Sequence, residues 1–348
     1  MRPQVTVCIP SYCRPASAAR ALDSALSEAR RVQAEVLLLD DASPDGTYVK
    51  LKARFGKASH LRLLRNPRNL GLVRNWNKGL KLAKGAHILF MGDDDTLLPG
   101  GLEASLAAHA AHPGIGFSFG AFDVIDGEGK KRFTQRPLGR LAQVLEPAEL
   151  WSWIYYYFSP VTLCAALLNT AKLRDIGGFQ EKAWYAADGD ALLRLAADRG
   201  AAYIPQSLSG SAWHGSNLQG EMKDQRMETV LSGIARDLPR PKALAGLDTG
   251  RLEALLRGRY AANSALLWAA ASATLERDAA LDDLRAQTRR LPDLADMGKP
   301  RMARASTLPG IGPAAVFAVR LLHFMRRRLA WPVGSPAQAR ARLERACA

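Results

Sequence analysis

Three consecutive carboxylates, Asp93, Asp94 and Asp95, follow the apolar segment 88–91. Like charges repel, so such a group is difficult to keep ionised unless a positive ion lies among its members. Mg²⁺ and Mn²⁺ prefer a few carboxylates together with phosphate oxygens and water, so the pattern predicts a divalent cation that bridges a nucleotide diphosphate. The alternative is that Asp95 caps a helix expected to begin near Pro99, because carboxylates favour helix N-termini. Capping accounts for one of the three aspartates.

A second acidic loop occupies residues 40–47, with the sequence Asp-Asp-Ala-Ser-Pro-Asp-Gly-Thr. An Asp-Gly pair is a turn signal, and the loop can simply turn the chain and cap the helix that follows. It also comes directly after an apolar strand pattern, as the carboxylates at 93–95 do. A carboxylate there can accept a hydrogen bond from the N3–H of a pyrimidine, so we expect Asp41 to select the base of a nucleotide.

The first half of the sequence predicts a regular scaffold for these loops. Apolar, β-rich segments are expected to form strands at 5–9, 36–39, 61–64 and 88–91, and helical patterns lie between them at 16–30, 47–55 and 72–83. This alternation is typical of a mostly parallel sheet with helices on both faces. Ligands bind such sheets at the carboxyl ends of the strands, which is where the loops 10–14, 40–46 and 92–95 lie.

The second half has weaker patterns. Strands are expected at 114–122 and 161–169, a Gly-Gly-Phe turn at 177–179 and a helix at 191–199, and the aromatic run at 151–158 is interpreted as core. After about residue 214 the sequence becomes rich in Ala, Leu and Arg, with helical patterns at 225–237, 251–275 and 277–291. We therefore expect an α/β domain at 1–218, with halves 1–112 and 113–218, and a basic helical C-terminal extension at 219–348.

The chain has 348 residues, 48% of them hydrophobic, and a formal net charge of +15. Its size suffices for a globular core, and its charge suits nucleic acid, a nucleotide diphosphate or an anionic membrane. No RNA-binding or zinc-finger motif accompanies the charge, which argues against nucleic acid. Cys8, Cys13, Cys164 and Cys347 form no C-x-x-C pair, and no secretory signal precedes the first strand pattern, so we expect a reduced, cytoplasmic location.

No segment has the roughly 18 uninterrupted apolar residues that span a bilayer. The closest is 311–322, which Arg320 interrupts and an arginine cluster at 326–328 and Trp331 follow. Such a sequence suits a helix in the membrane interface, so 311–331 predicts peripheral contact with the inner face of the membrane. The sequence leaves open the alternative of a helix packed on the α/β domain or on a second subunit of an oligomer.

Four motifs in a fixed order are specific. They are Val-Cys-Ile-Pro-Ser-Tyr-Cys-Arg at 7–14, Leu-Leu-Leu-Asp-Asp-Ala-Ser-Pro-Asp-Gly-Thr at 37–47, Asn-Leu-Gly at 69–71 continuing to Asn75, and Phe-Met-Gly-Asp-Asp-Asp-Thr-Leu-Leu-Pro at 90–99. This order resembles the family 2 glycosyltransferases of GT-A fold, over residues 5 to about 105 and more weakly to about 217. The resemblance implies a Rossmann-like, mostly parallel sheet flanked by helices, and an inverting, metal-dependent transfer from a UDP- or dTDP-sugar.

The resemblance also implies roles for single residues. Around the nucleotide it places Pro10, Tyr12, Arg14, Asp41, Arg74 and Asp93. At the cofactor, Mn²⁺ or Mg²⁺, it places Asp94 as the principal ligand, Asp95 in support, and His214 as the residue that completes the metal or diphosphate site. Gly92 stands where the family often has its first aspartate, which is a departure from the pattern.

The segment Ala-Asp-Gly-Asp-Ala-Leu at 187–192 resembles the family's Glu-Asp-x-Asp-Leu element, with Ala187 in place of glutamate. Asp188 then matches the catalytic base, which takes the proton of the acceptor hydroxyl, help worth roughly 10²- to 10⁴-fold. Asp190 is the reserve candidate. The alternative for both is an exposed position in the first turn of a helix. Trp184, or a ring of the aromatic run, can stack on a sugar acceptor.

Other protein classes fit less well. A dinucleotide-dependent dehydrogenase needs Gly-x-Gly-x-x-Gly after the first strand, where this chain has Pro10-Ser11-Tyr12. An inactive, non-catalytic binding or scaffold protein that docks through its basic tail remains the alternative, because Gly92 and Ala187 stand at usually acidic places. We expect the partners to be a nucleotide-sugar donor and a glycan or glycolipid acceptor, in the synthesis of a cell-surface polysaccharide or glycolipid.

Overall fold

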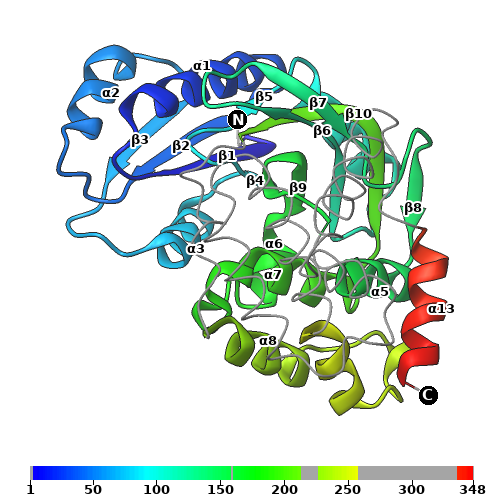
Figure 1. The fold of residues 1–348 in the computed structure, drawn as a ribbon. Coiled ribbons are helices and arrows are strands. Elements are labelled where there is room, and N and C mark those ends of the chain that lie inside the picture. The colour runs from blue at the N-terminus through cyan, green and yellow to red at the C-terminus, as the bar shows by residue number, and fades with distance from the viewer. Residues whose placement is uncertain (1–2, 158–159, 213–225, 258–334, 348) are drawn as a thin grey trace, which may run out of the picture.

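The computed structural model describes residues 3–157, 160–212, 226–257 and 335–347. Its described part contains a ten-stranded sheet with the strand order β3-β2-β1-β4-β9-β6-β10-β5, and β7 and β8 pair with β6 and β10. Helices cover both faces of this sheet (Figure 1). The predicted α/β architecture, a mostly parallel sheet flanked by helices, is confirmed.

The first half of the sheet is parallel. β1 (Val5–Ser11) lies between β2 (Glu35–Asp40) and β4 (His87–Phe90), and β3 (Leu61–Arg65) pairs with the other side of β2. The connecting helices are α1 (Pro15–Val32), α2 (Thr47–Phe55) and α3 (Leu72–Leu82). The sequence predicted all of these elements, with ends that differ by no more than about two residues, as is usual for element boundaries.

The side chains of β1 alternate between the two faces of the sheet, as they must in a strand. Val5, Val7 and Ile9 pack in the core that contains α1, whereas Cys8 belongs to the core on the α3 face. Helix α3 approaches β1 so closely that a Cβ atom at Gly79 would lie 2.3 Å from Cys8 Sγ. Glycine at position 79 therefore sets the distance between α3 and the strand that leads to the site.

The second half joins the first through an antiparallel strand. β9 (Ala166–Asn169) lies between β4 and β6 (Phe117–Ile125) and runs antiparallel to both, and β6 pairs in parallel with β10 (Ala201–Ala212). The short strands β5 (Thr96–Leu97), β7 (Lys131–Gln135) and β8 (Gln143–Leu145) pair antiparallel with their neighbours. Residues 163–165 form the 3₁₀ turn η1 (Leu163–Ala165), so the strand expected at 161–169 is shorter than predicted.

Sequence reasoning missed β10, a strand of 12 residues. Its pairing with β6 shifts register between Ile204 and Ser209, so its side chains do not alternate regularly. A strand without alternation carries no period-two signal, and that period is what predicts a half-buried strand from a sequence.

The helices of the second half lie on the two sheet faces. α4 (Gly101–Ala111) packs in the same core as α1. α5 (Pro147–Tyr157), α6 (Thr170–Asp175) and α7 (Ala187–Ala196) lie on the face of α3 (Figure 1). The 3₁₀ segment η2 (Glu181–Ala186) leads into α7. Trp151, Trp153 and Tyr155 of α5 are buried, so the interpretation of this aromatic run as core is confirmed for its described residues.

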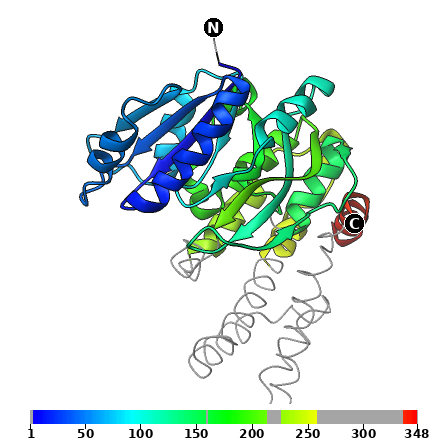
Figure 2. The same cartoon turned by 90° about the horizontal axis from the view of Figure 1, so that it is seen from above.

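The described parts of the C-terminal extension pack on the same core. These parts include α8 (Arg226–Asp237), η4 (Lys242–Leu244) and α13 (Pro336–Cys347), and Leu252 and Leu343 are buried in the cluster that contains α5. Tyr155 Oη donates to Leu252 O at 2.7 Å, which links α5 to the extension. α13 lies at the end of the molecule opposite β3 (Figure 2). The boundary at 218 stays a prediction, but the described parts of the extension form no body apart from the α/β domain.

Residues 311–331, for which we expect membrane contact, lie outside the described residues. Among the helices that the structure describes, none has the length and apolar character to cross a membrane.

Candidate active site

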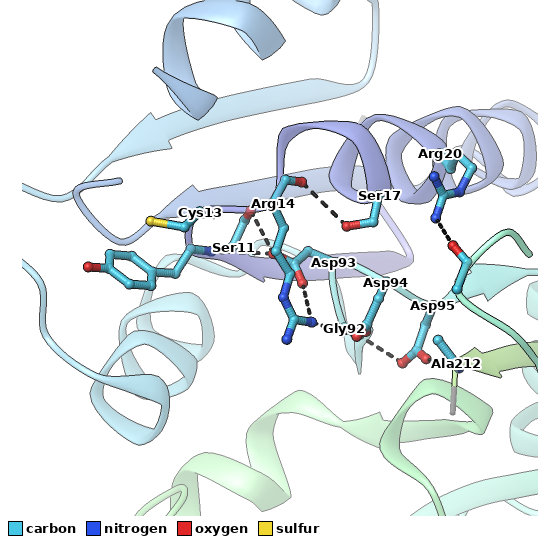
Figure 3. A network of polar contacts seen from close by, with 12 residues as sticks. Ser11, Cys13, Arg14, Ser17, Arg20, Gly92, Asp93, Asp94, Asp95 and Ala212 are labelled. Atoms are coloured by element: carbon cyan, nitrogen blue, oxygen red, sulfur yellow. Dashed lines mark hydrogen bonds and ion pairs between the residues drawn. The ribbon is translucent and has the colours of Figure 1, made fainter. Parts of the chain in front are cut away.

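The carboxyl ends of β1, β2 and β4 are neighbours, because β1 pairs in parallel with both other strands. The loops that leave these ends are the ones in which the sequence placed its candidate residues. Figure 3 shows that side chains from the loop after β1 reach those of the loop after β4.

Asp93, in the loop after β4, is buried beside the carboxyl end of β1. Its Oδ2 atom accepts hydrogen bonds from Ser11 Oγ at 2.8 Å and from the backbone N–H of Tyr12 at 3.3 Å. Its Oδ1 atom lies 3.4 Å from Arg14 Nη1. Burial raises the pKa of Asp93 to about 6, although the donors and the charge of Arg14 act in the opposite direction. An added positive charge at this carboxylate would offset the effect of burial.

Arg14 connects the loop after β1 with the loop after β4, residues 92–95, which is called the acidic loop below. Its Nη1 atom lies 2.5 Å from Asp94 Oδ2, so one guanidinium nitrogen lies between the carboxylates of Asp93 and Asp94 (Figure 3). The chain turns at Cys13, which has a positive φ of 57°, and the backbone N–H of Cys13 donates to Ser43 Oγ at 2.9 Å. This turn holds Arg14 at the start of α1, from where its side chain reaches the acidic loop.

Asp95 ties the end of β10 to the acidic loop. Its Oδ1 atom accepts from the backbone N–H of Ala212 at 2.9 Å, and its Oδ2 atom accepts from that of Gly92 at 3.2 Å. Burial, followed by the charge of Asp94, raises the pKa of Asp95 to about 6. Asp95 thus holds Ala212, the last residue of β10, next to the acidic loop. In the sequence, His214 follows two residues later.

The alternative interpretation of Asp95 as a helix cap is wrong. β5 separates Asp95 from α4, and the first amides of α4 bond to a side chain of α1 instead. Glu28 accepts from the backbone N–H of Gly100 at 3.0 Å and from that of Leu102 at 3.3 Å. A carboxylate does lie at this N-terminus, as the helix dipole favours, but a distant helix supplies it.

Gly92 leaves room for two carboxylates. A Cβ atom at position 92 would lie 2.7 Å from Asp94 Oδ1 and 3.0 Å from Asp95 Oδ2. An aspartate at position 92 would therefore displace its neighbours from the positions described above.

Asp41 is only 4% exposed and its carboxylate binds the segment that leads into α3. Oδ1 accepts from Asn66 Nδ2 at 2.6 Å and from the backbone N–H of Leu70 at 2.9 Å, and Oδ2 accepts from that of Gly71 at 3.0 Å. These contacts fix residues 66–71 beside the end of β2. The role predicted for Asp41 in choosing the base stays a prediction, alongside this positioning role.

Arg74 and the adjacent turn of α3 link the nucleotide-binding half to the segment before α7. Arg74 Nε donates to Glu181 Oε2 at 2.7 Å, and both side chains are exposed. Asn77 exchanges two hydrogen bonds with the backbone of Phe179, at 2.8 and 2.9 Å. The Gly-Gly-Phe turn and η2 are thereby held against α3, close to the residues that Asp41 positions.

The two aspartates of α7 have different surroundings. The Asp190 carboxylate pairs with Arg194 at 2.8 Å, and their side chains are 6% and 10% exposed. Arg194 also donates to the carbonyl oxygens of Ile176 and Gly178, at 2.6 and 2.5 Å. Asp188 is half-buried, and its Oδ1 accepts from the backbone N–H of Gly189 at 2.7 Å. Burial raises the pKa of Asp188. Asp190 therefore holds the turn at 176–178, whereas the carboxylate of Asp188 bonds within its own helix.

The remaining predicted residues are placed as follows. Pro10 is buried in β1 opposite Leu39, and Tyr12 is 47% exposed beside the site. His214 lies outside the described residues, and within the described ranges no three His, Cys, Asp or Glu side chains gather as a metal site. Sequence reasoning missed the contacts of Ser11 and Arg194. The first motif contains Ser11, but no local pattern signals Arg194.

Comparison with known proteins adds a family and a fold. Residues 6–174 match the family model described as Glycosyl transferase family 2. An uncharacterised protein of Mycobacterium tuberculosis, MT1568, is 31% identical over 60% of this chain and 66% of its own length. The succinoglycan biosynthesis protein ExoO of Rhizobium meliloti is 30% identical over 44% of each chain. The chain thus spans less than two thirds of the length of these relatives.

Two solved structures share the fold. Residues 1–349 of TarS from S. aureus, solved in complex with UDP-GlcNAc, give a TM-score of 0.59 at 17% identity, with 93% of this chain and 92% of that chain covered. The mannosyltransferase PcManGT from Pyrobaculum calidifontis, solved with GDP-Man and Mn²⁺, gives 0.54 at 17% identity, with 92% and 87% covered. At this identity the likeness concerns the fold alone.

Proposed function

Because this chain belongs to glycosyl transferase family 2, we propose that it transfers a sugar from a UDP- or dTDP-sugar to a hydroxyl group of a glycan or glycolipid acceptor. The observation that carries the proposal is the meeting of Arg14, Asp93 and Asp94 at the carboxyl ends of β1 and β4. A divalent cation can bind to the carboxylates of this group, and the oxygens of a diphosphate can bind both to that cation and to Arg14.

The proposed cofactor is Mn²⁺ or Mg²⁺, which can be held by one or two carboxylates together with the oxygens of a diphosphate. Asp93 is buried with a raised pKa and lies next to two further carboxylates, so an added cation would stabilise its ionised form. Asp94 would hold the ion, Asp93 would lie beside it, and Asp95 would support the loop, with His214 as the fourth proposed residue. When bound, the cation neutralises charge that develops on the departing diphosphate. The Mn²⁺ with which PcManGT was solved supports this choice.

The acceptor is activated by Asp188 in this proposal. A carboxylate with a raised pKa is well suited to accept the proton of a hydroxyl group as that oxygen bonds to the anomeric carbon. The proton moves to Asp188, the bond from the anomeric carbon to the diphosphate oxygen breaks, and attack opposite the leaving group inverts the anomeric configuration. Burial raises the pKa of Asp190 as well, but the carboxylate of Asp190 is held by Arg194, so Asp190 is the poorer base.

One relative supports a proposal for the class of product. ExoO is a succinoglycan biosynthesis protein, and this chain is 30% identical to it over 156 residues. We therefore propose a role in the synthesis of a cell-surface polysaccharide or glycolipid, with the basic C-terminal segment at the membrane surface.

Ligand-dependent unfolding tests the donor site, because a ligand that binds only the folded state raises the unfolding midpoint. We expect UDP, dTDP or their sugars to raise the midpoint with Mn²⁺ and to have no effect with a chelator, and GDP serves as the control for base choice. Asp94→Asn should abolish the metal-dependent increase, whereas Asp188→Asn should keep it and lose UDP release from the donor. No response to any nucleotide would overturn the proposal in favour of a scaffold protein.

A further inference from the structure

Arg14 occupies a position that a catalytic cation would need. Its Nη1 atom lies 2.5 Å from Asp94 Oδ2 and 3.4 Å from Asp93 Oδ1. Mg²⁺ binds carboxylate oxygens at roughly 2.0–2.1 Å, so an ion bound to Asp94 Oδ2 on the side that faces Asp93 would overlap the guanidinium nitrogen of Arg14. One positive group has to leave when the other binds.

The contacts of Asp93 leave one of its two oxygens facing Arg14. Asp93 Oδ2 is bonded to Ser11 and Tyr12, so Asp93 Oδ1 is the oxygen that faces Arg14 and the neighbouring Asp94. The side chains of Arg14 and Asp94 are 33% and 18% exposed, so their ion pair is partly removed from water and attracts more strongly than a surface pair.

We propose that Arg14 is an internal counter-cation, which neutralises Asp93 and Asp94 in the donor-free protein and moves to the donor diphosphate when a metal ion binds Asp94. The inference rests on the proposed function, because it requires a metal-bound diphosphate. The resemblance places Arg14 only somewhere around the nucleotide, and this inference assigns it to the phosphates and the metal site.

The consequence is a coupling between metal and nucleotide. Metal alone must displace Arg14 from its ion pairs with Asp93 and Asp94 without supplying a new anion for it, so we expect free Mn²⁺ to bind weakly. With a nucleoside diphosphate present, the displaced guanidinium binds phosphate oxygens, which suits its geometry. Each ligand therefore strengthens the other, and couplings of this type are about 5- to 150-fold in affinity.

The test is Mn²⁺ binding by calorimetry and by electron paramagnetic resonance, without and with UDP. Arg14→Gln removes the charge, and we expect it to bind Mn²⁺ alone about 5- to 150-fold more tightly than the unchanged protein. UDP should then improve Mn²⁺ binding by a smaller factor in the variant than in the unchanged protein. Arg14→Lys keeps a positive charge and should stay close to the unchanged protein.

Arg20→Gln is the matched control. Arg20 lies on the same helix, and its guanidinium donates to Gly127 O at 2.8 Å, away from the acidic loop (Figure 3). The control removes the same charge from the protein and should leave Mn²⁺ binding unchanged. Thermal unfolding of each variant shows whether that variant is folded. If Arg14→Gln does not fold, Arg14→Lys is tested in its place, and the proposal requires that Arg14→Lys still binds Mn²⁺ weakly when UDP is absent.

The outcomes separate the two proposals. Equal Mn²⁺ affinity in Arg14→Gln, Arg20→Gln and the unchanged protein overturns the counter-cation and leaves the proposed function standing. Tighter binding in Arg14→Lys as well also overturns it, because charge would not be the reason. If Mn²⁺ binds to none of the proteins even with UDP, the metal-dependent function itself is wrong.

Discussion

Asp188→Asn and Asp190→Asn are isosteric changes on the same helix, and the structure predicts opposite effects for them. The Asp190 carboxylate pairs with Arg194, whose guanidinium also bonds to two carbonyl oxygens of the turn at 176–178. Asp188 bonds to the backbone of the residue next to it. Asp190→Asn should therefore unfold more easily, whereas Asp188→Asn should lose activity and keep its stability.

The size of the first effect follows from burial. With side-chain exposures of 6% and 10%, the pair is removed from water, and breaking such a pair costs about 3–5 kcal/mol. Asparagine keeps one oxygen that can accept from Arg194, so we expect the lower end, about 3 kcal/mol. In a chain of 348 residues, with an unfolding entropy of about 2.1 cal/mol/K per residue, that loss lowers the thermal midpoint by about 4 °C.

Asp188→Asn should behave differently. Its amide oxygen can still accept from Gly189, and an uncharged side chain is easier to bury than a carboxylate, so the free energy of unfolding should change by less than about 1 kcal/mol. Without a base, UDP release from the donor should fall by about 10²- to 10⁴-fold.

Urea and thermal unfolding, measured beside UDP release, test both variants. Arg194→Met combined with Asp190→Asn is the control, because removing both charges should cost less than the sum of the single changes. Loss of UDP release in Asp190→Asn at unchanged stability would refute the reasoning and identify Asp190 as the base.

Three further predictions concern stability. The rings of His87 and His109 lie 4.2 Å apart, and burial lowers the pKa of both, that of His109 to about 4. In the unfolded chain both histidines bind a proton near pH 6.5, so their contribution to stability is fully present above about pH 6.5 and is lost as the pH falls towards 4. Urea midpoints that do not change between pH 7.5 and 5 would contradict this. Gly79→Ala should destabilise by about 1–3 kcal/mol, because the new methyl group would overlap Cys8 Sγ, and Cys8→Ala should restore part of the loss in a double-mutant cycle followed by urea unfolding. Cys13→Asn should stabilise by up to about 1 kcal/mol in thermal unfolding, since asparagine tolerates the left-handed φ of 57° better, and a lower midpoint would show that the thiol makes a compensating contact.

The sequence alone determined the scaffold of the first half. Strand and helix patterns differ in period, and each period depends on local backbone geometry, so the elements from β1 to β4 could be read with nearly correct ends. The acidic loop, the loop at 40–47 and the first motif could also be recognised, because each is a short run of consecutive residues. Their common position at one sheet edge followed from the parallel order of the strands.

Tertiary structure decided which side chains meet. The contact of Arg14 with Asp94 depends on the pairing of β1 with β4, and that of Asp95 with Ala212 depends on β10, a strand whose irregular register hid it from the sequence. The different partners of Asp188 and Asp190 could not be predicted from the sequence either, because both residues lie in one short segment and differ only in what surrounds them. Periodicity reports the face on which a residue lies, whereas hydrogen-bond partners far apart in the chain are fixed only when strands pair and helices pack.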